Sequence, residues 1–261
     1  MDRVPDTSPH PVAASAGDLL SPAVAPSAGL PAAVLWDMDG TLIDTEPCWI
    51  AAERQLVESY GGTWSQEEAE ALIGVALLDA APVFQAAGVD LEPREIARRL
   101  TATVIDLLPT ATFQPGALEL LAQLTAAGVP SAIVTASYRP MVDAVVALTP
   151  PGSFAAVVTG DEVARGKPDP LPYLRAAELL GVDPRHCVAI EDSPPGITAA
   201  LASGARTLGV PHQLPVPPRP GLSRVASLAD VTLADLTRLR AGEVLDGLAG
   251  RGARAEADAV R

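Results

Sequence analysis

Short apolar runs alternate with helix-length amphipathic segments from about residue 117 to residue 210. Several amphipathic segments are followed by a glycine (Gly128, Gly181, Gly204), a residue that commonly ends helices. This alternation is typical of βαβ units, which build a parallel sheet covered by helices. The predicted helices are Ala117–Ala127, Pro140–Leu148, Pro170–Leu180 and Pro195–Ala202, and the predicted strands are Ser131–Thr135, Ala156–Thr159, Cys187–Ile190 and Arg206–Val210.

An earlier apolar run, residues 32–36, ends abruptly at Asp37 and Asp39, which are followed by Gly40 and Thr41. An unbroken apolar run indicates a strand buried on both faces, as in a parallel sheet. Ligands of such sheets bind beyond the carboxyl ends of the strands, where both aspartates are expected. Two carboxylates this close repel each other unless a cation or a shared proton lies between them. Taken alone, these residues fit a strand that ends in a solvated Asp-Gly turn equally well.

The distance to the next strand predicts an insertion. Asp37 and Ser131 are 94 positions apart, whereas a βαβ unit needs about 30 residues. The surplus has helical periodicity, and residues 112–116 are expected to form a hinge. At this edge of the sheet the insertion would act as a lid that excludes water and selects the substrate. Its predicted helices are Glu46–Tyr60, Gln66–Ile73, Leu77–Ala87 and Glu92–Leu108.

The predicted fold class is α/β, a Rossmann-like parallel sheet core with an inserted helical cap domain. The core is expected at residues 31–46 and 114–241, and the cap at residues 47–113. Residues 1–30 are rich in Pro, Ala and Ser and lack a basic start, so we expect a disordered tail and not a signal peptide. Residues 242–261 are expected to form a frayed helix or a second tail.

Composition narrows the partners. The formal net charge of −14 argues against nucleic acid and anionic membranes, although an anionic small substrate fits if a metal ion and a local cation offset the field. No segment is apolar for long enough to cross a bilayer. The two cysteines show no pairing pattern, which suits the reducing cytoplasm with both thiols buried. We therefore expect a cytoplasmic protein, by default a monomer.

The later strand ends carry a hydroxyl group and a cation. Thr135 and Ser137 flank Ala136, where a hydroxyl beside backbone N–H groups could hold a phosphoryl oxygen; a strand residue followed by a helix cap is the alternative. Lys167 is the only lysine among 18 basic residues. A single lysine among so many arginines indicates a site that needs a compact ammonium. That ammonium could bridge a carboxylate and a phosphate oxygen. A solvated surface lysine is the ordinary alternative.

Two more acids, Glu191 and Asp192, follow the predicted strand Cys187–Ile190 and precede Ser193. A helix N-cap at Asp192 or Ser193 would explain them without any function. Together with Asp37 and Asp39, however, they would place four carboxylates at one edge of the sheet. Such a cluster needs a hard divalent cation, and ligation by oxygen alone suits Mg²⁺.

These segments together resemble the haloacid dehalogenase (HAD) superfamily, phosphatase branch, with a helical cap of the β-phosphoglucomutase-like type. The resemblance covers about residues 32–239. Within the branch, residues 44–49 and 183–193 are similar to bacterial hexitol-phosphate and 2-deoxyglucose-6-phosphate phosphatases. Four motifs in order are a strong signal, although each is weak alone. They are Asp37-Met38-Asp39-Gly40-Thr41, Thr135, Lys167-Pro168 and Glu191-Asp192-Ser193.

The resemblance implies a Mg²⁺-dependent phosphatase that hydrolyses a small phosphorylated metabolite, a sugar or polyol phosphate. Asp37 would attack phosphorus and form an aspartyl-phosphate, with Asp39 as general acid and base. Mg²⁺ would be held by the Asp37 carboxylate, the Asp39 backbone carbonyl and Asp192, supported by Glu191 and Ser193.

The phosphoryl oxygens would be stabilised by Thr135, the Ala136 N–H and Lys167. Gly40 would let the backbone turn sharply beside the phosphate.

Rival activities differ in a few residues. Dehalogenases of the superfamily lack an acid at the position of Asp39, and its phosphonate hydrolases use a cap lysine that is missing here. A β-phosphoglucomutase-like mutase, the closer rival, would carry a cap arginine soon after residues 74–75 and a histidine at the position of Trp49. This chain has Ala-Leu-Leu at residues 76–78, and ordinary cap packing explains Leu77 and Trp49 equally well. A catalytically silent binding protein on the same fold would not need every chemical position filled, as it is here.

Overall fold

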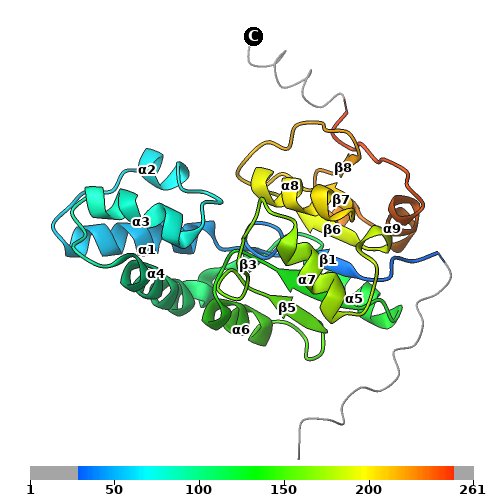
Figure 1. Ribbon diagram of the computed structural model, residues 1–261, viewed down its shortest axis with the longest axis horizontal. Coiled ribbons are helices and arrows are strands. Elements are labelled where there is room, and N and C mark those ends of the chain that lie inside the picture. Colours follow the sequence, from blue (N-terminus) through cyan, green and yellow to red (C-terminus); the bar gives the residue numbers. More distant parts are fainter. Residues whose placement is uncertain (1–28, 250–261) are drawn as a thin grey trace, which may run out of the picture.

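The computed structural model describes residues 29–249 (Figure 1). Most of the predicted N-terminal tail, residues 1–28, and the end of the predicted C-terminal tail, residues 250–261, lie outside the described residues.

Six strands form one parallel sheet in the order β5-β4-β1-β6-β7-β8. β1 lies in the middle, where Val34 pairs with Ser131 on one side and with Val188 on the other. The predicted α/β class with a parallel sheet is confirmed. The strands are β1 (Val34–Trp36), β4 (Ser131–Val134), β5 (Ala156–Val158), β6 (Val188–Glu191), β7 (Arg206–Gly209) and β8 (Leu222–Arg224).

The apolar run that predicted β1 is buried on both faces of the sheet. Val34 and Trp36 belong to one hydrophobic cluster, and Ala33 and Leu35 to a second on the opposite face. All four residues are fully buried. A strand covered on both sides cannot alternate apolar with polar residues, and this is why the run is continuous.

Helices cover both faces of this sheet. Helices α5, α6 and α9 contribute to the cluster around Trp36, and α7 and α8 to the cluster around Leu35. These helices are α5 (Ala117–Ala126), α6 (Arg139–Ala147), α7 (Leu171–Leu179), α8 (Pro194–Ser203) and α9 (Leu233–Arg240). Short 3₁₀ helices lie at Leu108–Thr110, Pro184–His186 and Leu228–Asp230.

Four helices between β1 and β4 form a group beside the sheet (Figure 1). They are α1 (Glu46–Ser59), α2 (Gln66–Glu70), α3 (Leu77–Ala86) and α4 (Pro93–Leu107). α4 packs against α1 and α3, and the rings of Trp64 and Phe84 stack with their centroids 5.1 Å apart. This group is the helical insertion that the spacing of the strands predicted.

The two chain segments that join the sheet to the inserted helices pair with each other. β2 (Ile43–Asp44) and β3 (Thr112–Phe113) form a two-stranded antiparallel sheet, with Asp44 opposite Thr112. The backbone N–H of Gln114 also donates to the carbonyl of Leu42 at 3.0 Å. The hinge predicted at residues 112–116 is therefore partly a strand, because its backbone groups bond to the outgoing segment.

Several other boundaries differ from the prediction. β8 and α9 had no predicted counterpart. The second predicted helix ends at Glu70, three residues early, because i→i−3 bonds tighten the chain into turns that lead to Gly74. Residues 242–249, part of the segment predicted as a frayed helix or tail, contact β8: the Leu245 N–H donates to the Ser223 hydroxyl at 3.0 Å, and Asp246 pairs with Arg224 at 2.7 Å. These contacts hold the segment against the end of β8.

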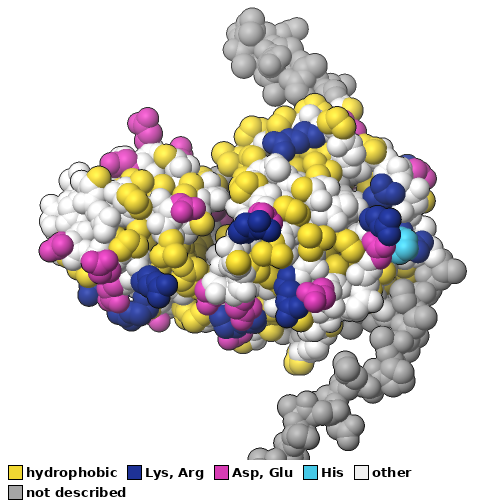
Figure 2. All heavy atoms as spheres, viewed as in Figure 1, with side chains coloured by type: hydrophobic (Ala, Val, Ile, Leu, Met, Phe, Trp, Pro, Cys, Tyr) yellow, Lys and Arg dark blue, Asp and Glu magenta, His cyan; other side chains and the backbone are white. Residues whose placement is uncertain are grey.

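Arginine and acidic side chains are interspersed over the face of the molecule in Figure 2. Within residues 29–249, no helix is both long and apolar enough to span a membrane.

Candidate active site

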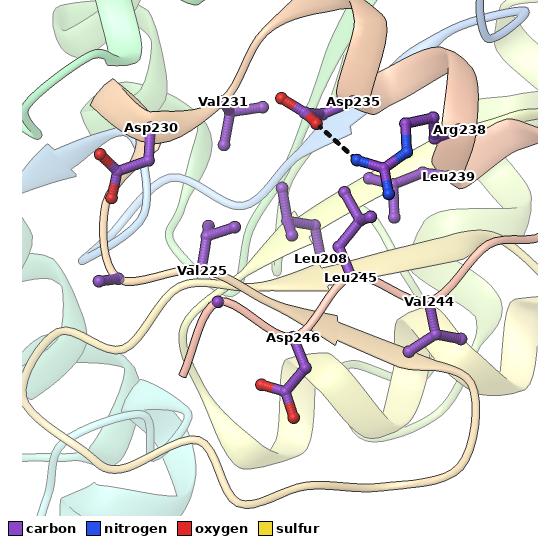
Figure 3. A pocket seen from close by; sticks show the side chains of 12 residues that line it. Leu208, Val225, Asp230, Val231, Asp235, Arg238, Leu239, Val244, Leu245 and Asp246 are labelled. Carbon is purple, nitrogen blue, oxygen red and sulfur yellow. Dashed lines mark hydrogen bonds and ion pairs between the residues drawn. The ribbon is translucent and has the colours of Figure 1, made fainter. Parts of the chain in front are cut away.

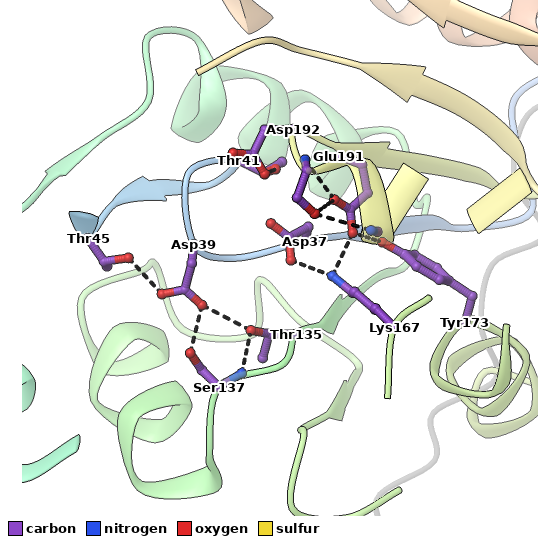
Figure 4. Close-up of polar contacts among 12 residues, drawn as sticks. Asp37, Asp39, Thr41, Thr45, Thr135, Ser137, Lys167, Tyr173, Glu191 and Asp192 are labelled. Atoms are coloured by element: carbon purple, nitrogen blue, oxygen red, sulfur yellow. Dashed lines mark hydrogen bonds and ion pairs between the residues drawn. The ribbon is translucent and has the colours of Figure 1, made fainter. Parts of the chain in front are cut away.

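Asp37 and Asp39 lie directly after β1, at the carboxyl edge of the sheet (Figure 4). The Asp37 N–H donates to the carbonyl of Ile190 at 3.0 Å, which continues the β1–β6 ladder and fixes the turn that carries Asp37. The Asp37 side chain is only 7% exposed. The same edge receives the ends of β4 and β6, so residues far apart in the chain meet here.

Lys167 lies between two carboxylates. Its ammonium is 2.5 Å from Asp37 Oδ1 and 2.6 Å from Glu191 Oε1, and its side chain is 7% exposed. The Tyr173 hydroxyl donates to the same Glu191 oxygen at 2.6 Å, and the ammonium is 5.5 Å from the Tyr173 ring centroid. Burial alone would lower the pKa of Lys167, but the charges of Asp37 and Glu191 raise it above its ordinary value. Lys167 is thus a fixed cation at this site.

The acids here outnumber the cation. Burial raises the pKa of Asp37 to about 7, and the charges of Glu191 and Asp39 add to this rise although Lys167 opposes it. Burial and the nearby Asp37 charge raise the pKa of Asp192 well above its usual range. Both carboxyls therefore lack compensating positive charge in the protein alone.

A divalent cation fits this deficit. Asp37, Glu191 and Asp192 each offer a carboxylate oxygen, and these three atoms lie within 4.8 Å of one another. An oxygen-only donor set in this arrangement suits a hard cation. The Thr41 hydroxyl donates to Asp192 Oδ1 at 3.1 Å and orients that carboxylate.

Glu191 has a different role from the other two acids. Its Oε1 accepts from Lys167 and Tyr173, and its Oε2 accepts from the Ser193 hydroxyl at 3.0 Å and the Ser193 N–H at 3.3 Å. Glu191 therefore orients Lys167. Ser193 also accepts from the Gly196 N–H at 3.2 Å and caps helix α8. The N-cap alternative is correct for Ser193, and the same residue supports the acidic cluster.

Asp39 is held by four side-chain donors. Its Oδ1 accepts from the Thr45 hydroxyl at 2.6 Å and from Trp49 Nε1 at 3.4 Å. Its Oδ2 accepts from the Thr135 hydroxyl at 3.0 Å and the Ser137 hydroxyl at 2.7 Å. Two of the donors come from the start of the inserted helices and two from the loop after β4. The position of Asp39 thus depends on how the insertion sits on the sheet.

Gly40 makes room for the acidic cluster. Its φ is +81°, and a Cβ placed there would lie 2.3 Å from Asp192 Oδ2. The sharp turn between Asp39 and Thr41 therefore requires glycine, as expected, and the crowding atom is a carboxylate oxygen.

The structure brings together the residues that the sequence singled out: Asp37, Asp39, Thr135, Lys167, Glu191, Asp192 and Ser193 (Figure 4). Ala136 lies in the same loop as Thr135, with an exposed side chain. Sequence reasoning gave no role to Thr41, Thr45 or Tyr173. Thr41 stands inside the first motif and could have been weighed, whereas nothing in the sequence marks Tyr173.

A separate cavity of about 420 Å³ lies between α9 and the segment 244–247 (Figure 3). It shares no lining residue with the acidic cluster, and its Arg238 is paired with Asp235 and Glu243. The acidic cluster is therefore the better candidate for chemistry.

A family model described as haloacid dehalogenase-like hydrolase matches residues 31–204, which include the whole acidic cluster and Lys167. The chain belongs to this family. Hexitol phosphatase B of Escherichia coli (strain K12) is 34% identical to this HAD-like hydrolase over 218 residues, which make up 82% of this chain and 96% of that protein. The phosphorylated carbohydrates phosphatase of Thermotoga maritima is 32% identical over 189 residues, 70% of this chain and 86% of that protein.

Solved structures agree with this assignment. The crystal structure of CbbY from Rhodobacter sphaeroides in complex with phosphate superimposes with a TM-score of 0.71 and 28% sequence identity, over 77% of this chain and 96% of that one. The family and the phosphatase relatives make this HAD-like hydrolase a phosphoric monoester hydrolase, as the sequence predicted. Enzymes of the family generally use a divalent metal, and the buried acidic cluster of this chain offers a place for one.

Proposed function

We propose that the protein is a Mg²⁺-dependent phosphatase of small sugar or polyol phosphates that works through an aspartyl-phosphate on Asp37. The proposal depends above all on the position of Asp37, whose Oδ1 contacts Lys167 while both residues are shielded from solvent. The relatives named for hexitol and phosphorylated-carbohydrate phosphatase activity support the substrate class.

Asp37 and Asp39 divide the chemistry between them. Asp37 Oδ2 attacks phosphorus as the ester oxygen leaves, and protonated Asp39 gives its proton to that oxygen. Asp39, now ionised, takes a proton from a water molecule that attacks the phosphoryl group and releases Asp37. Four side-chain donors hold the Asp39 carboxyl in place for these proton transfers.

The anionic phosphoryl group needs positive charge on several sides. Lys167, which already contacts Asp37, would also contact a phosphoryl oxygen. The Thr135 hydroxyl and the Ala136 N–H would bind further phosphoryl oxygens once Thr135 exchanges its bond to Asp39. Mg²⁺, held by Asp37, the Asp39 carbonyl and Asp192, would supply charge neutralisation and keep Asp37 ionised.

The inserted helices, residues 47–113, would serve as the cap that covers this site. Gly74, in the turn after α2, lies close to the sheet edge, since a Cβ placed on it would be 3.9 Å from the Cβ of Ser193. A cap in this place excludes water from the aspartyl-phosphate until the leaving alcohol has departed.

Phosphate release from a panel of esters tests the proposal. The panel contains sorbitol 6-phosphate, mannitol 1-phosphate, 2-deoxyglucose 6-phosphate, p-nitrophenyl phosphate and phosphoglycolate, each with Mg²⁺ and with EDTA. We expect Mg²⁺-dependent turnover that is fastest with a sugar or polyol phosphate, and none with Asp37→Asn. Equal turnover with EDTA, or a preference for phosphoglycolate, would contradict the proposal.

Mutase activity is the alternative, and one residue argues against it. Trp49 occupies the position where the mutase resemblance calls for a histidine, and its indole N–H donates to Asp39 at 3.4 Å. Incubation with β-glucose 1-phosphate separates the two activities. A phosphatase releases inorganic phosphate, whereas a mutase yields glucose 6-phosphate.

A further inference from the structure

His212 lies in the loop that follows β7 and contacts both segments that join the sheet to the inserted helices. Its Nε2 is 3.0 Å from Asp44 Oδ1, on the outgoing segment, and its Nδ1 is 3.1 Å from Gln114 Nε2, on the returning segment. These two partners are 70 positions apart in the chain, at the two ends of the insertion. The contacts are largely shielded, because the His212 side chain is 17% exposed.

Both ring nitrogens of His212 have a partner: Nδ1 faces the Gln114 amide nitrogen, which donates, and Nε2 faces the Asp44 carboxylate, which accepts. The amide nitrogen of Gln213 is a further neighbour, 3.4 Å from Nε2. The imidazole also packs against the catalytic turn, since a Cβ placed on Gly40 would be 3.3 Å from His212 Cδ2. His212 therefore touches three segments at once.

The loop that carries His212 is itself fixed to the sheet. The Val210 N–H donates to the carbonyl of Glu191 at 2.8 Å, and the Val225 N–H donates to the carbonyl of Gly209 at 3.1 Å. His212 therefore lies two residues after a backbone hydrogen bond that holds the start of its loop to β6, and from there it contacts both connecting segments.

The contact with Asp44 leads directly to the general acid. Asp44 precedes Thr45, whose hydroxyl donates to Asp39 at 2.6 Å, and α1 begins at the next residue with Glu46. Trp49, one turn further along α1, also donates to Asp39. A shift of Asp44 would therefore move two of the four donors that hold Asp39.

From this geometry we infer that His212 is a positioning residue: it fastens both connecting segments to the core, and so sets the approach of the inserted helices and the placement of Asp39. Catalysis depends steeply on such placement, because small displacements of reacting groups cost large factors in rate. The kinetic part of this inference rests on the proposed phosphatase activity, and the exchange measurement below does not.

The first test compares two phosphoryl donors. Acetyl phosphate has a good leaving group and little to contact in a cap, whereas sorbitol 6-phosphate needs both the general acid and the cap. For His212→Ala we expect kcat/KM for sorbitol 6-phosphate to fall about tenfold or more, through a lower kcat and a higher KM. The kcat/KM for acetyl phosphate should fall less than about threefold. His212→Gln, which keeps a donor and an acceptor on a flexible chain, should recover part of the loss.

His186→Ala serves as the control, because it removes an exposed histidine at the opposite edge of the sheet. It should retain wild-type kinetics. If His212→Ala lowers kcat by the same factor for both donors with KM unchanged, the variant has only lost folded protein, and the inference is wrong.

Hydrogen–deuterium exchange of the full chain provides the independent readout. In His212→Ala we expect faster exchange of the backbone amides in residues 42–46 and 112–116, with residues 131–134 of β4 unchanged. If His212→Ala does not fold, Gln114→Leu takes its place. It removes one of the two contacts and should show a smaller increase in exchange in the same residues. Unchanged exchange in both connecting segments would overturn the inference. Failure of the proposed phosphatase activity would instead appear as wild-type protein that hydrolyses no ester in the panel, with the exchange result unaffected.

Discussion

The ammonium of Lys167 and Oδ1 of Asp37 lie 2.5 Å apart, although 130 positions separate the two residues in the sequence. The pair is buried, and Glu191 contacts the same ammonium at 2.6 Å. Burying an ion pair costs desolvation free energy. Removing one partner destabilises the protein further, because the other charge is left buried without compensation. The lone lysine of the chain is therefore an active-site residue in the proposed function.

Replacing Lys167 tests this relationship. Lys167→Met leaves Asp37 and Glu191 facing each other, so we expect kcat to fall by about 10³-fold or more and the protein to lose about 3 kcal/mol of stability. Lys167→Arg keeps the charge but introduces a wide planar group between two carboxylates and the Tyr173 ring, so a loss of about 100-fold in kcat is expected. Steady-state kinetics and thermal unfolding measure both effects.

Arg165→Ala is the matched control, since the Arg165 side chain is 70% exposed and pairs with Asp169. It should change kcat less than about twofold. A Lys167→Arg variant with wild-type kcat would show that a compact ammonium is not required.

Asp39→Asn tests the division of labour between the aspartates. An asparagine cannot deliver or accept the proton, so kcat for sorbitol 6-phosphate should fall by about 10³-fold. The Thr135 and Ser137 hydroxyls can rotate to accept from the new amide, so the fold should persist. Acetyl phosphate needs no acid in the first step, and the variant should therefore accumulate aspartyl-phosphate, visible by intact-protein mass spectrometry.

Asp37→Asn is the comparison for that experiment, because it removes the attacking carboxylate and should show neither turnover nor a phosphorylated mass. Accumulation of phosphorylated protein in Asp37→Asn would show that Asp37 is not the attacking residue. Normal turnover by Asp39→Asn would show that Asp39 is not the general acid and base.

The sequence was sufficient for the parallel sheet, the insertion and most of the acidic cluster, because these features follow from local patterns. β1 is an unbroken apolar run, and residues at the carboxyl ends of parallel strands must meet at one edge. The roles of Tyr173 and His212 could not be predicted, because they do not follow from local patterns. Each makes contacts with partners far away in the chain, Tyr173 with Glu191 and His212 with Asp44, and no spacing encodes them.

The connecting strands β2 and β3 were also missed, since each has only two residues. Pairs this short carry no periodicity, and the pairing exists only because the two ends of the insertion return to the same place.

Gly196 shows where local propensity and structure disagree. It lies inside helix α8, where alanine would be favoured by about 1 kcal/mol. A Cβ at this position, however, would lie 1.9 Å from Glu191 Oε1 and 2.1 Å from the carboxyl carbon. Gly196→Ala should therefore displace Glu191 from Lys167, lower the unfolding temperature and reduce kcat by about tenfold or more.

Gly166→Ala is the control for that variant, because a Cβ on Gly166 would meet no atom within 4 Å and its φ is not in the left-handed region. It should leave the unfolding temperature within about 2 °C of the wild type. A more stable Gly196→Ala protein would show that Glu191 can move aside without cost.

The excess of buried carboxyls predicts how metal-free protein responds to pH. The pKa of Asp37 is raised to about 7 in the folded protein, mainly by burial, whereas an unfolded aspartate titrates near pH 4. Between these values the folded state holds a proton that the unfolded state has lost, so stability must fall as pH rises from about 4 to about 7. Burial raises the pKa of Glu46 and of Glu53, on α1, to about 7 as well, which acts in the same direction.

In EDTA, we therefore expect the unfolding temperature to fall by about 5–10 °C between pH 5 and pH 8. Mg²⁺ should restore part of this loss at pH 8, where Asp37 is ionised, and little at pH 5, where metal must compete with protons. The restoration is incomplete because Glu46 and Glu53 lie outside the trio of acids that could hold the ion.

Asp192→Asn separates these contributions. It removes one candidate ligand and one buried carboxyl whose pKa burial and the Asp37 charge raise, so its metal-free unfolding temperature at pH 8 should exceed that of the wild type, and Mg²⁺ should no longer raise it. A wild-type protein that is most stable at pH 8 without metal would show that these carboxyls are compensated by the protein itself, and the need for a divalent cation at this site would disappear.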